Sequence, residues 1–401
     1  MRFANVKGFG ANHFELQSGG QRLLPMEGMR GMAAFLVFFV HFWQLFGTRS
    51  LGTPVEKVFH SMGTLGHRGV DIFFALSGFI IYGLLLKGKI GYFEFVKRRI
   101  HRLYPAFSFV FILYTVIMLA VPSYSKLPSS IFPAVIYLCA NYLMLPGLFP
   151  IEPMITVAWS LSYEVCFYLT IPLICRCLSL AAWPRQARIC FFLVLSAVWL
   201  MIWPAGSNHP RMAMFLCGIL VRECMHLRFK WTVFGNYAAI LLFLACLTMS
   251  GLRSEQKVSE VFGPIIGGSK FELPFLFLAT FILGYFALVD KGLVSRFFSW
   301  DWLRWFGNMS YSYYLVHGAI LSFTRNGAEH LGLPARLGPG GFLALCLLCF
   351  GATVIGGSVI FLTIEKPMLF RKSESPQPLL EPAKALQERA MIAGGPVPPS
   401  H

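Results

Sequence analysis

Ten near-continuous apolar stretches fill most of this chain, and they constrain its fold more than any other feature. Judged by length and bounding charges, they fall at about residues 31–47, 69–86, 104–121, 157–175, 189–204, 211–221, 234–250, 271–289, 309–324 and 341–364. A helix needs about 20 apolar residues to cross a bilayer. Hydrophobic residues make up 56% of the chain and charged ones 13%, far from the balance of a soluble domain. The pattern predicts an all-α integral membrane protein with about ten transmembrane helices.

A further apolar run at 131–144 is shorter and contains Pro133 and Asn141. If residues 122–156 stay on one side of the membrane, the two tails and the loops on their side carry 24 of the 34 lysines and arginines. Such an excess is typical of the cytoplasmic side, and it would be lost if 131–144 crossed. We therefore expect a re-entrant or interfacial segment at 131–146, both termini in the cytoplasm, and a multi-pass membrane protein.

Composition divides the chain into three parts. Residues 1–25 are expected to form a cytoplasmic N-terminal tail, and residues 26–370 the transmembrane domain. Residues 371–401 are rich in proline, glycine and alternating charge, a composition typical of disorder, so a disordered cytoplasmic tail is expected there.

Several function classes are disfavoured. The net charge of +16 does not indicate a nucleic-acid partner, because the basic residues lie in short loops between apolar runs. The chain has no metal-ligand spacing, no glycine-rich phosphate loop and no G-x-S-x-G nucleophile motif. General-base chemistry is therefore favoured over covalent or metal-dependent chemistry.

Arg30 and His41 stand at the two ends of one apolar run, in the segment GMRGMAAFLVFFVHFW. A cation and an imidazole are costly in hydrocarbon, so each indicates a function. Eleven residues of helix span roughly 16 Å, about half the thickness of the hydrocarbon core. The pair can therefore link the cytoplasmic surface to a buried reactive centre.

A cluster of cations follows the second apolar run: Lys97, Arg98, Arg99 and Arg102. Arg99 and Arg102 are three residues apart and share one face of a helix, where two guanidinium groups can bind phosphates bidentately. The alternative is a stop-transfer anchor that contacts anionic lipid.

The segment VAWSLSYEVCFYL places Trp159, Ser160, Ser162 and Glu164 directly before or within an apolar run. A carboxylate about one turn inside the membrane edge needs a partner, and a buried arginine or His41 is a candidate. The alternative is a helix N-terminus capped by a serine, with the carboxylate favoured by the helix dipole.

Further polar side chains occur in two other apolar runs, namely Asp71 and Ser77 in the first and Ser310, Tyr311, Ser312 and His317 in the second. Serine and tyrosine can act as interhelical hydrogen-bond partners or as part of an aromatic belt. His317 lies eight residues into its run, where an interhelical hydrogen bond remains an alternative to a catalytic role.

In their order and spacing, six segments resemble the membrane-bound acyltransferase 3 family: LPMEGMRGMAAFLVFFVHF, GVDIFFALSGFII, KRRIHRLYPAF, AWSLSYEVCFYL, GNMSYSYYLVHGAI and IEKPMLFR. Members of this family O-acylate surface polysaccharides, Nod factors, macrolides and related acceptors. The resemblance runs from about Leu24 to Arg371. It implies a ten-helix bundle that takes an acyl group, most commonly acetyl, from cytoplasmic acyl-CoA and delivers it to a hydroxyl of a carbohydrate or glycolipid.

The resemblance also implies roles for individual residues. The Arg-x10-His motif of the family falls on Arg30 and His41, and its R-x-x-R motif on Arg99 and Arg102. Its W-S-L-S-x-E motif falls on residues 159–164, and its S-Y-S-x-Y-L-x-H motif on residues 310–317. Two departures are Glu27, where the family usually has aspartate, and Val165, where many members have a second glutamate, so a role that needs two adjacent carboxylates is doubtful.

These residues suggest a mechanism in which neutral His41 abstracts the proton of the acceptor hydroxyl as that oxygen attacks the thioester carbonyl. Arg30 and the Arg99/Arg102 pair would hold the CoA phosphates, and Tyr311 or His317 would stabilise the oxyanion. Acyl-CoA is then a substrate, and no tightly bound cofactor or metal is expected. The rival hypotheses are a transporter, which would also suit ten helices with buried charges, and a membrane sensor without catalysis.

The charge bias predicts a topology that cysteine-accessibility labelling can test. Cysteines introduced near Lys89 and Arg185 should react from the cytoplasm, and those near Lys57 and Gly268 from the outside. Labelling of position 185 from the outside would mean that 131–144 crosses the membrane, and would contradict the ten-helix arrangement.

Overall fold

The computed structural model describes residues 8, 10–16, 23–47, 54–88, 90–121, 124–203, 209–227, 232–252, 272–332 and 337–370. The predicted tail 371–401 and the labelling positions Lys89 and Gly268 lie outside the described residues. The main helices are α2 (Leu24–Phe46), α3 (Pro54–Gly66), α4 (Arg68–Leu85), α5 (Tyr92–Ala120), α6 (Ile131–Tyr142), α7 (Ala158–Cys177), α8 (Arg185–Ile202), α9 (Ala213–Glu223), α10 (Thr232–Leu252), α12 (Glu272–Leu288), α13 (Leu293–Phe298), α14 (Asp301–Asn308), α15 (Ser310–His330), α16 (Pro339–Ile360) and α17 (Lys366–Phe370). The described part of the chain contains no β-strand, so the all-α prediction is confirmed there.

Within the part of the chain that the structure describes, six helical segments are long and apolar enough to cross a membrane: Leu24–Phe46, Lys57–Leu85, Tyr92–Ala120, Ala158–Cys177, Arg185–Ile202 and Pro339–Leu369. The protein is therefore an integral membrane protein, but the count of ten crossings is not confirmed. The predicted run 211–221 forms α9, which has only 11 residues and lies buried inside the bundle. At about 1.5 Å per residue, α9 reaches through about half of the hydrocarbon core.

Segment 131–146 forms a short helix at the edge of the bundle. Helix α6 has 12 residues, a length of about 18 Å, which is less than the thickness of the hydrocarbon core. After it the chain turns back, and Asn141 ties the turn together: its Nδ2 donates to the carbonyl oxygen of Glu152 at 3.3 Å, and its Oδ1 accepts from the amide of Met154 at 2.7 Å. The length agrees with the prediction of a segment that does not span.

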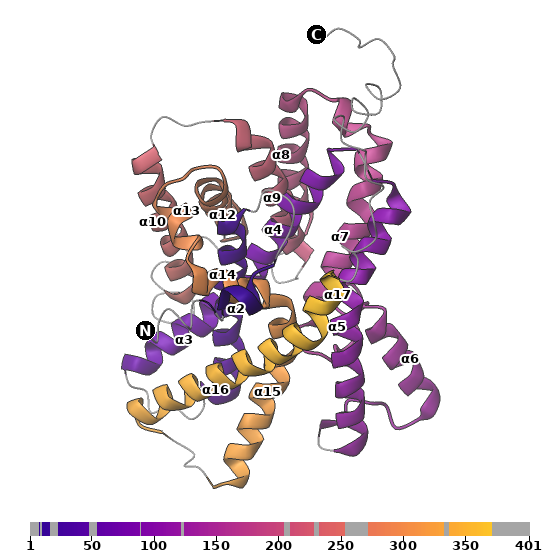
Figure 1. Ribbon diagram of the computed structural model, residues 1–401, viewed down its shortest axis with the longest axis vertical. Coiled ribbons are helices and arrows are strands. Elements are labelled where there is room, and N and C mark those ends of the chain that lie inside the picture. The colour runs from indigo at the N-terminus through magenta and orange to yellow at the C-terminus, as the bar shows by residue number, and fades with distance from the viewer. Residues whose placement is uncertain are drawn as a thin grey trace, which may run out of the picture.

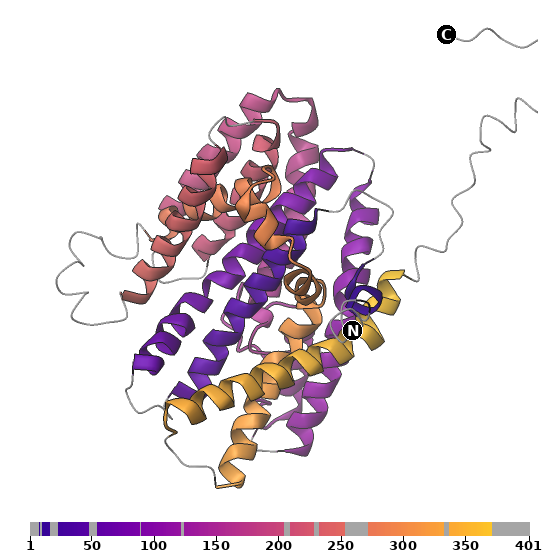
Figure 2. The same cartoon turned by 60° about the vertical axis from the view of Figure 1, so that its left-hand side comes forward.

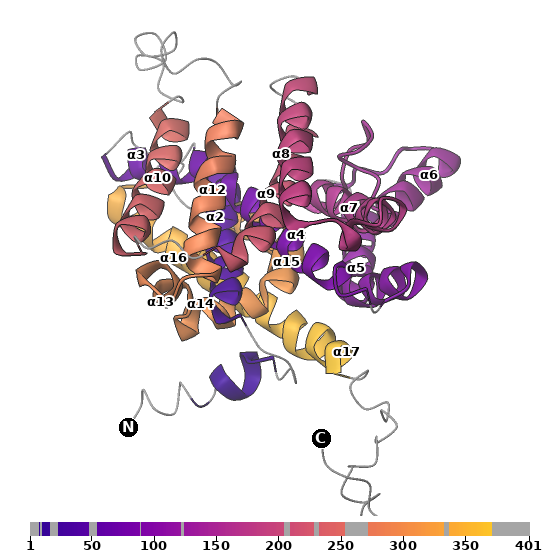
Figure 3. The ribbon, with the colours of Figure 1, turned by 90° about the horizontal axis from the view of Figure 1, so that it is seen from above.

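Helices α2 and α4 occupy the centre of the molecule. Seen from above, they lie between α3, α10 and α12 on one side and α5, α6 and α7 on the other (Figures 1 and 3). Helix α16 runs obliquely past α15, and the two helices pack together (Figure 2). The central helices α2 and α4 carry three polar residues of the sequence motifs, Arg30, His41 and Ser77. Each of these side chains lines a pocket inside the bundle.

Glycines allow the central helices to approach their neighbours closely. A Cβ atom on Gly31 would lie 2.1 Å from the carbonyl oxygen of Leu303, and one on Gly218 would lie 1.7 Å from the carbonyl oxygen of Ala75. Such contacts between backbones are possible only without a side chain, as is usual where membrane helices cross. They fix α2 against α14 and α4 against α9.

A buried ion cluster holds the N-terminal end of α2. Arg304 on α14 is 5% exposed and pairs with Glu27 at 3.2 Å, Glu15 at 2.8 Å and Asp301 at 3.0 Å. Asn308 also donates to Glu27, at 3.4 Å. Glu27, which the sequence motif predicted as a site residue, therefore anchors α2 to α14.

Replacing Arg304 with methionine should lower the stability of the fold strongly. The substitution leaves the buried carboxylate of Glu27 without its cation, and loss of one partner of a buried pair typically costs about 3–5 kcal/mol. The matched control is Arg325→Met, because Arg325 forms an exposed pair with Glu329 at 3.1 Å within α15. Thermal unfolding of the detergent-solubilised protein should show a much lower midpoint for Arg304→Met only, and equal midpoints would contradict the anchoring role.

Candidate functional site

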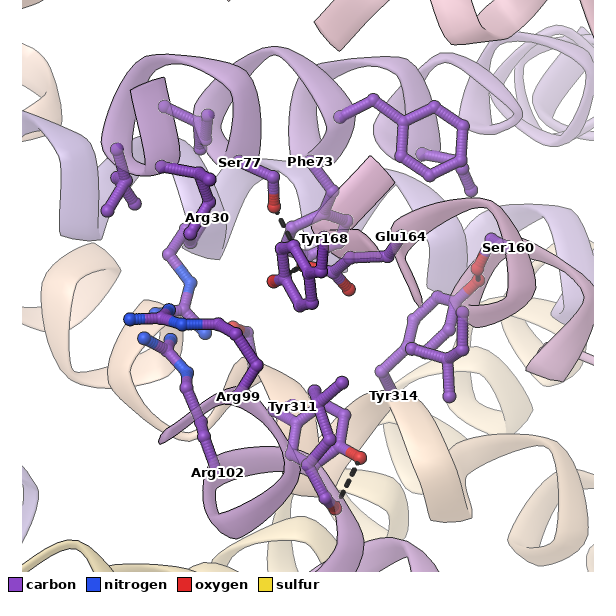
Figure 4. A pocket seen from close by; sticks show the side chains of 18 residues that line it. Arg30, Phe73, Ser77, Arg99, Arg102, Ser160, Glu164, Tyr168, Tyr311 and Tyr314 are labelled. Atoms are coloured by element: carbon purple, nitrogen blue, oxygen red, sulfur yellow. Dashed lines mark hydrogen bonds between the residues drawn. The ribbon is translucent and has the colours of Figure 1, made fainter. Parts of the chain in front are cut away.

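A pocket between α2, α4, α5, α7 and α15 collects most of the polar residues that the motifs contain. We call it the arginine pocket, and its polar lining consists of Arg30, Ser77, Arg99, Arg102, Ser160, Glu164, Tyr168, Ser310, Tyr311 and Tyr314. Apolar side chains of α4 and α7 complete the wall. Residues distant in the sequence thus meet in one enclosed space (Figure 4).

Three guanidinium groups face this space together. Arg30 comes from α2, whereas Arg99 and Arg102 lie three residues apart on α5, and their side chains extend side by side (Figure 4). Nε of Arg99 is buried and has no hydrogen-bond partner. Because Glu164 is the one carboxylate in the pocket lining, the lining carries an excess of positive charge. An excess of buried cations is costly in a membrane unless an anion binds there.

Glu164 is held in place by hydroxyl groups. Its Oε1 accepts a hydrogen bond from Ser77 Oγ of α4 at 2.7 Å and another from the hydroxyl of Tyr168, one helical turn further along α7. The guanidinium of Arg99 lies 5.8 Å from the centre of the Tyr168 ring, a cation–π contact. The two hydroxyl groups therefore fix the position of the Glu164 carboxylate in the arginine pocket.

Ser310 and Tyr311 start α15 at the floor of the arginine pocket. The hydroxyl of Tyr311 donates to the carbonyl oxygen of Leu103 at 2.8 Å and so links α15 to α5. The hydroxyl of Ser310 is buried and has no partner. A hydrogen-bond donor that lines a pocket without a partner is available to a ligand.

His41 and His317 form a hydrogen-bonded pair, with His41 Nδ1 at 3.3 Å from His317 Nε2. His317 is fully buried, and its Nδ1 lies 2.9 Å from the carbonyl oxygen of Tyr314 and 3.2 Å from that of Tyr313. His41 Nδ1 also lies 3.0 Å from the carbonyl oxygen of Val37. Two helices, α2 and α15, thus present their histidines to each other.

These contacts assign the tautomers of the neutral pair. A carbonyl oxygen only accepts, so Nδ1 of His317 must carry the hydrogen and its Nε2 must accept. Nδ1 of His41, which faces two acceptors, must then donate to them. The lone pair of His41 therefore resides on Nε2, the nitrogen that makes no contact within the pair.

His41 lines a second pocket, not the arginine pocket. We call it the histidine pocket, and its polar lining consists of His41, Gln44, Thr64, His67, Arg68, Thr156, Trp159, Arg211 and Glu272. Arg211 lies 5.7 Å from the centre of the Trp159 ring. Two residues, Val70 and Tyr314, line both pockets, so the two spaces meet there.

Besides Glu27, Ser312 and His317, four of the predicted residues lie outside both pockets. Lys97 and Arg98 are exposed, and Arg98 pairs with Glu94 at 2.9 Å on the surface of α5. Asp71 is buried, with Arg68 at 3.6 Å and Arg211 at 3.9 Å. Ser162 donates its hydroxyl to the carbonyl oxygen of Pro146.

Comparison with known proteins identifies the family. A family model described as an acyltransferase domain matches residues 25–361. The chain belongs to the acyltransferase 3 family. It is therefore an enzyme that transfers acyl groups, and the transporter and sensor hypotheses lose their support.

Curated relatives agree with this assignment. The acyltransferase MdmB of Streptomyces mycarofaciens is 24% identical over 87% of this chain and 92% of its own length. The O-acetyltransferase OatA of Staphylococcus aureus is 28% identical over 65% of this chain and 47% of its own length, so the match spans about half of OatA. No solved structure matches the chain.

The sequence did not point to two residues of the pockets, Tyr168 and Arg211, or to Glu365, which lines neither pocket. Tyr168 follows Glu164 by four residues, a helical spacing that indicates contact. Arg211 sits in a short segment before α9 that has no recognisable pattern. Glu365 ends a π-helical turn after α16 and accepts from the hydroxyl and amide of Ser312 at 2.5 and 3.2 Å. The segment IEKPMLFR, which contains Glu365, is part of the family resemblance, but no role was predicted for this residue. A π-helical turn could have drawn attention to it, since such turns often mark functional sites.

Proposed function

We propose that this acyltransferase moves an acyl group, with acetyl the expected one, from cytoplasmic acyl-CoA to a hydroxyl of a surface polysaccharide or related glycan. The observation that carries the proposal is the pair of adjoining pockets, one with three arginines and one with His41. The arginine pocket suits an anionic acyl donor, and the histidine pocket presents a base to the acceptor hydroxyl. The protein would act in a bacterial inner membrane with both termini in the cytoplasm.

The arginine pocket would hold the phosphates of CoA. Guanidinium groups bind phosphate oxygens bidentately, and Arg30, Arg99 and Arg102 face one space (Figure 4). The unpartnered Nε of Arg99 supplies a donor without breaking a contact. We assign no donor contact to Lys97 or Arg98, because both lie on the exposed face of α5.

His41 would act as the general base through Nε2. This nitrogen takes the proton of the acceptor hydroxyl while the hydroxyl oxygen bonds to the thioester carbon. The carbon–sulfur bond then breaks, and the proton passes to the CoA thiolate as it leaves. His317 is a positioning residue in this scheme, because its Nε2 holds the hydrogen of His41 Nδ1 and keeps Nε2 of His41 free.

The oxyanion needs a hydrogen-bond donor, and the contacts narrow the choice. Neutral His317 donates its only N–H to main-chain carbonyl oxygens, and the hydroxyl of Tyr311 donates to the carbonyl oxygen of Leu103. Neither of the two donors suggested by the sequence is therefore free. The unpartnered hydroxyl of Ser310 lines the arginine pocket, so we propose that it donates to the bound acyl-CoA there and not to the oxyanion, which forms beside His41.

A glycan suits the histidine pocket. Gln44, Thr64 and Thr156 offer side chains that exchange hydrogen bonds with sugar hydroxyls, and Trp159 offers an aromatic face. The name of OatA, an O-acetyltransferase, also suggests that the acceptor atom is a hydroxyl oxygen.

Donor binding can be tested at the arginines. Arg102→Lys should weaken acetyl-CoA affinity, because a planar fork becomes a point charge. The double variant Arg99→Ala/Arg102→Ala should weaken it by at least about 100-fold, since each charged hydrogen bond contributes roughly 1.5–3 kcal/mol. Arg98→Ala is the control on the same helix, and calorimetry should find its affinity unchanged. Unchanged affinity of the folded double variant would leave only a lipid-anchoring role for these arginines.

The base can be tested at His41. General-base catalysis typically contributes about 10² to 10⁴ in rate, so His41→Ala and His41→Gln should lose nearly all transfer while acetyl-CoA still binds. The control is His101→Gln, at an exposed position of α5. Wild-type activity should also fall at acid pH, because protonated His41 has no lone pair. Transfer above about a tenth of the wild-type rate in His41→Gln at saturating substrate would show that His41 is not the base.

A further inference from the structure

The two pockets share two lining side chains. Val70 on α4 and Tyr314 on α15 line both the arginine pocket and the histidine pocket, and each is only 6% exposed. Every other lining residue belongs to one pocket only. The pockets therefore adjoin at these two side chains, which we call the boundary, and a group that crosses there passes Val70 and Tyr314.

The proposed chemistry requires such a passage. The guanidinium groups line one pocket and His41 lines the other, yet the thioester carbon must come within bonding distance of the hydroxyl that His41 deprotonates. The pantetheine arm of CoA is long, thin and flexible, whereas the nucleotide end is bulky and charged. The arm with its acyl group is therefore the part that crosses the boundary.

Hydrogen bonds hold the Tyr314 side chain across the boundary. Its hydroxyl shares a hydrogen bond with Ser160 Oγ at 2.7 Å and donates to the carbonyl oxygen of Val157 at 3.2 Å. The ring packs edge-on against Phe73, with centroids 6.0 Å apart. Two neutral hydrogen bonds restrain the side chain but are weak enough to break, so the side chain can rotate.

Rotation of Tyr314 would leave the histidine pair aligned. His317 Nδ1 donates to the main-chain carbonyl of Tyr314 and not to its side chain. A change of rotamer moves the ring and leaves that carbonyl in α15. The side chain can therefore move aside for the acyl arm while Nε2 of His41 keeps its lone pair.

On these grounds we infer that Tyr314 and Val70 form a gate between donor and acceptor pockets, and that the space between these two side chains sets the size of the acyl group transferred. The inference rests on the proposed function, since it takes acyl-CoA as the donor. A narrow gap admits a short unbranched acyl group such as acetyl and excludes longer ones. The closed gate also keeps water and His41 from the thioester, so that hydrolysis to CoA thiol and free acid is suppressed.

The test uses the full-length protein in nanodiscs with acetyl-, butyryl- and hexanoyl-CoA as probes. Calorimetry first measures acetyl-CoA binding, and release of CoA thiol without added glycan then measures hydrolysis at each chain length. Tyr314→Ala should raise hydrolysis of acetyl-CoA by at least about tenfold. It should also raise the hexanoyl-to-acetyl ratio by about tenfold, because one methylene in a fitted pocket already changes rates by about that factor.

Two milder variants distinguish an effect on closure of the gate from an effect on the width of the gap. They remain informative if Tyr314→Ala does not fold. Tyr314→Phe removes both hydroxyl contacts but keeps the ring, so hydrolysis should rise several-fold with the chain-length ratio unchanged. Val70→Ala widens the gap from the other side, so the ratio should rise. Val316→Ala is the control for Val70→Ala, because Val316 is equally buried but lines neither pocket, and it should change neither quantity.

The outcomes distinguish the gate from the function it rests on. If wild-type protein binds no acetyl-CoA, the proposed function fails and the gate fails with it. If acetyl-CoA binds but neither hydrolysis nor the chain-length ratio of folded Tyr314→Phe and Val70→Ala differs from that of Val316→Ala, only the gate is overturned.

Discussion

The hydrogen bond between His41 and His317 is the interaction on which the proposed chemistry depends. It joins α2 to α15 across 276 residues of sequence, and with the main-chain carbonyls of Val37 and Tyr314 it allows one arrangement of hydrogens in the neutral pair. That arrangement leaves the lone pair of His41 on Nε2. A histidine without such acceptors beside Nδ1 would lack this constraint, because either nitrogen could carry its proton.

The bilayer explains why the remaining polar residues are arranged as they are. Charges within the hydrocarbon must be paired or must face a cavity. The same need for a partner holds for Arg304, which lies outside the six apolar helical segments: three carboxylates surround it, and it fastens α2 to α14. Arg30, Arg99 and Arg102 meet the second condition, since they face one pocket together (Figure 4). The positions of the arginines thus separate a structural cluster from a candidate binding site.

Short-range sequence patterns predicted the helices and the shared helical face of Arg99 and Arg102, because both depend on residues that are close in sequence. The apolar runs gave the helical spans, and the three-residue spacing of Arg99 and Arg102 placed both on one side of α5. Contacts between distant residues left no such pattern. The pairing of Glu27 with Arg304 joins residues 277 positions apart, and the entry of Arg211 into the histidine pocket depends on how α9 packs. The short α9 also shows why hydropathy alone does not fix the number of crossings, since a buried half-helix is as apolar as a span.

The tautomer of His41 tests the central claim most directly. Nitrogen-15 NMR of histidine-labelled protein in lipid bilayers at neutral pH distinguishes protonated from unprotonated ring nitrogens, and the His41 signals are those missing from His41→Gln. The account predicts a neutral ring with hydrogen on Nδ1, an unprotonated Nε2, and coupling of Nδ1–H to the His317 ring. Hydrogen on Nε2 of His41, or a charged imidazolium at neutral pH, would contradict the assignment of Nε2 as the base.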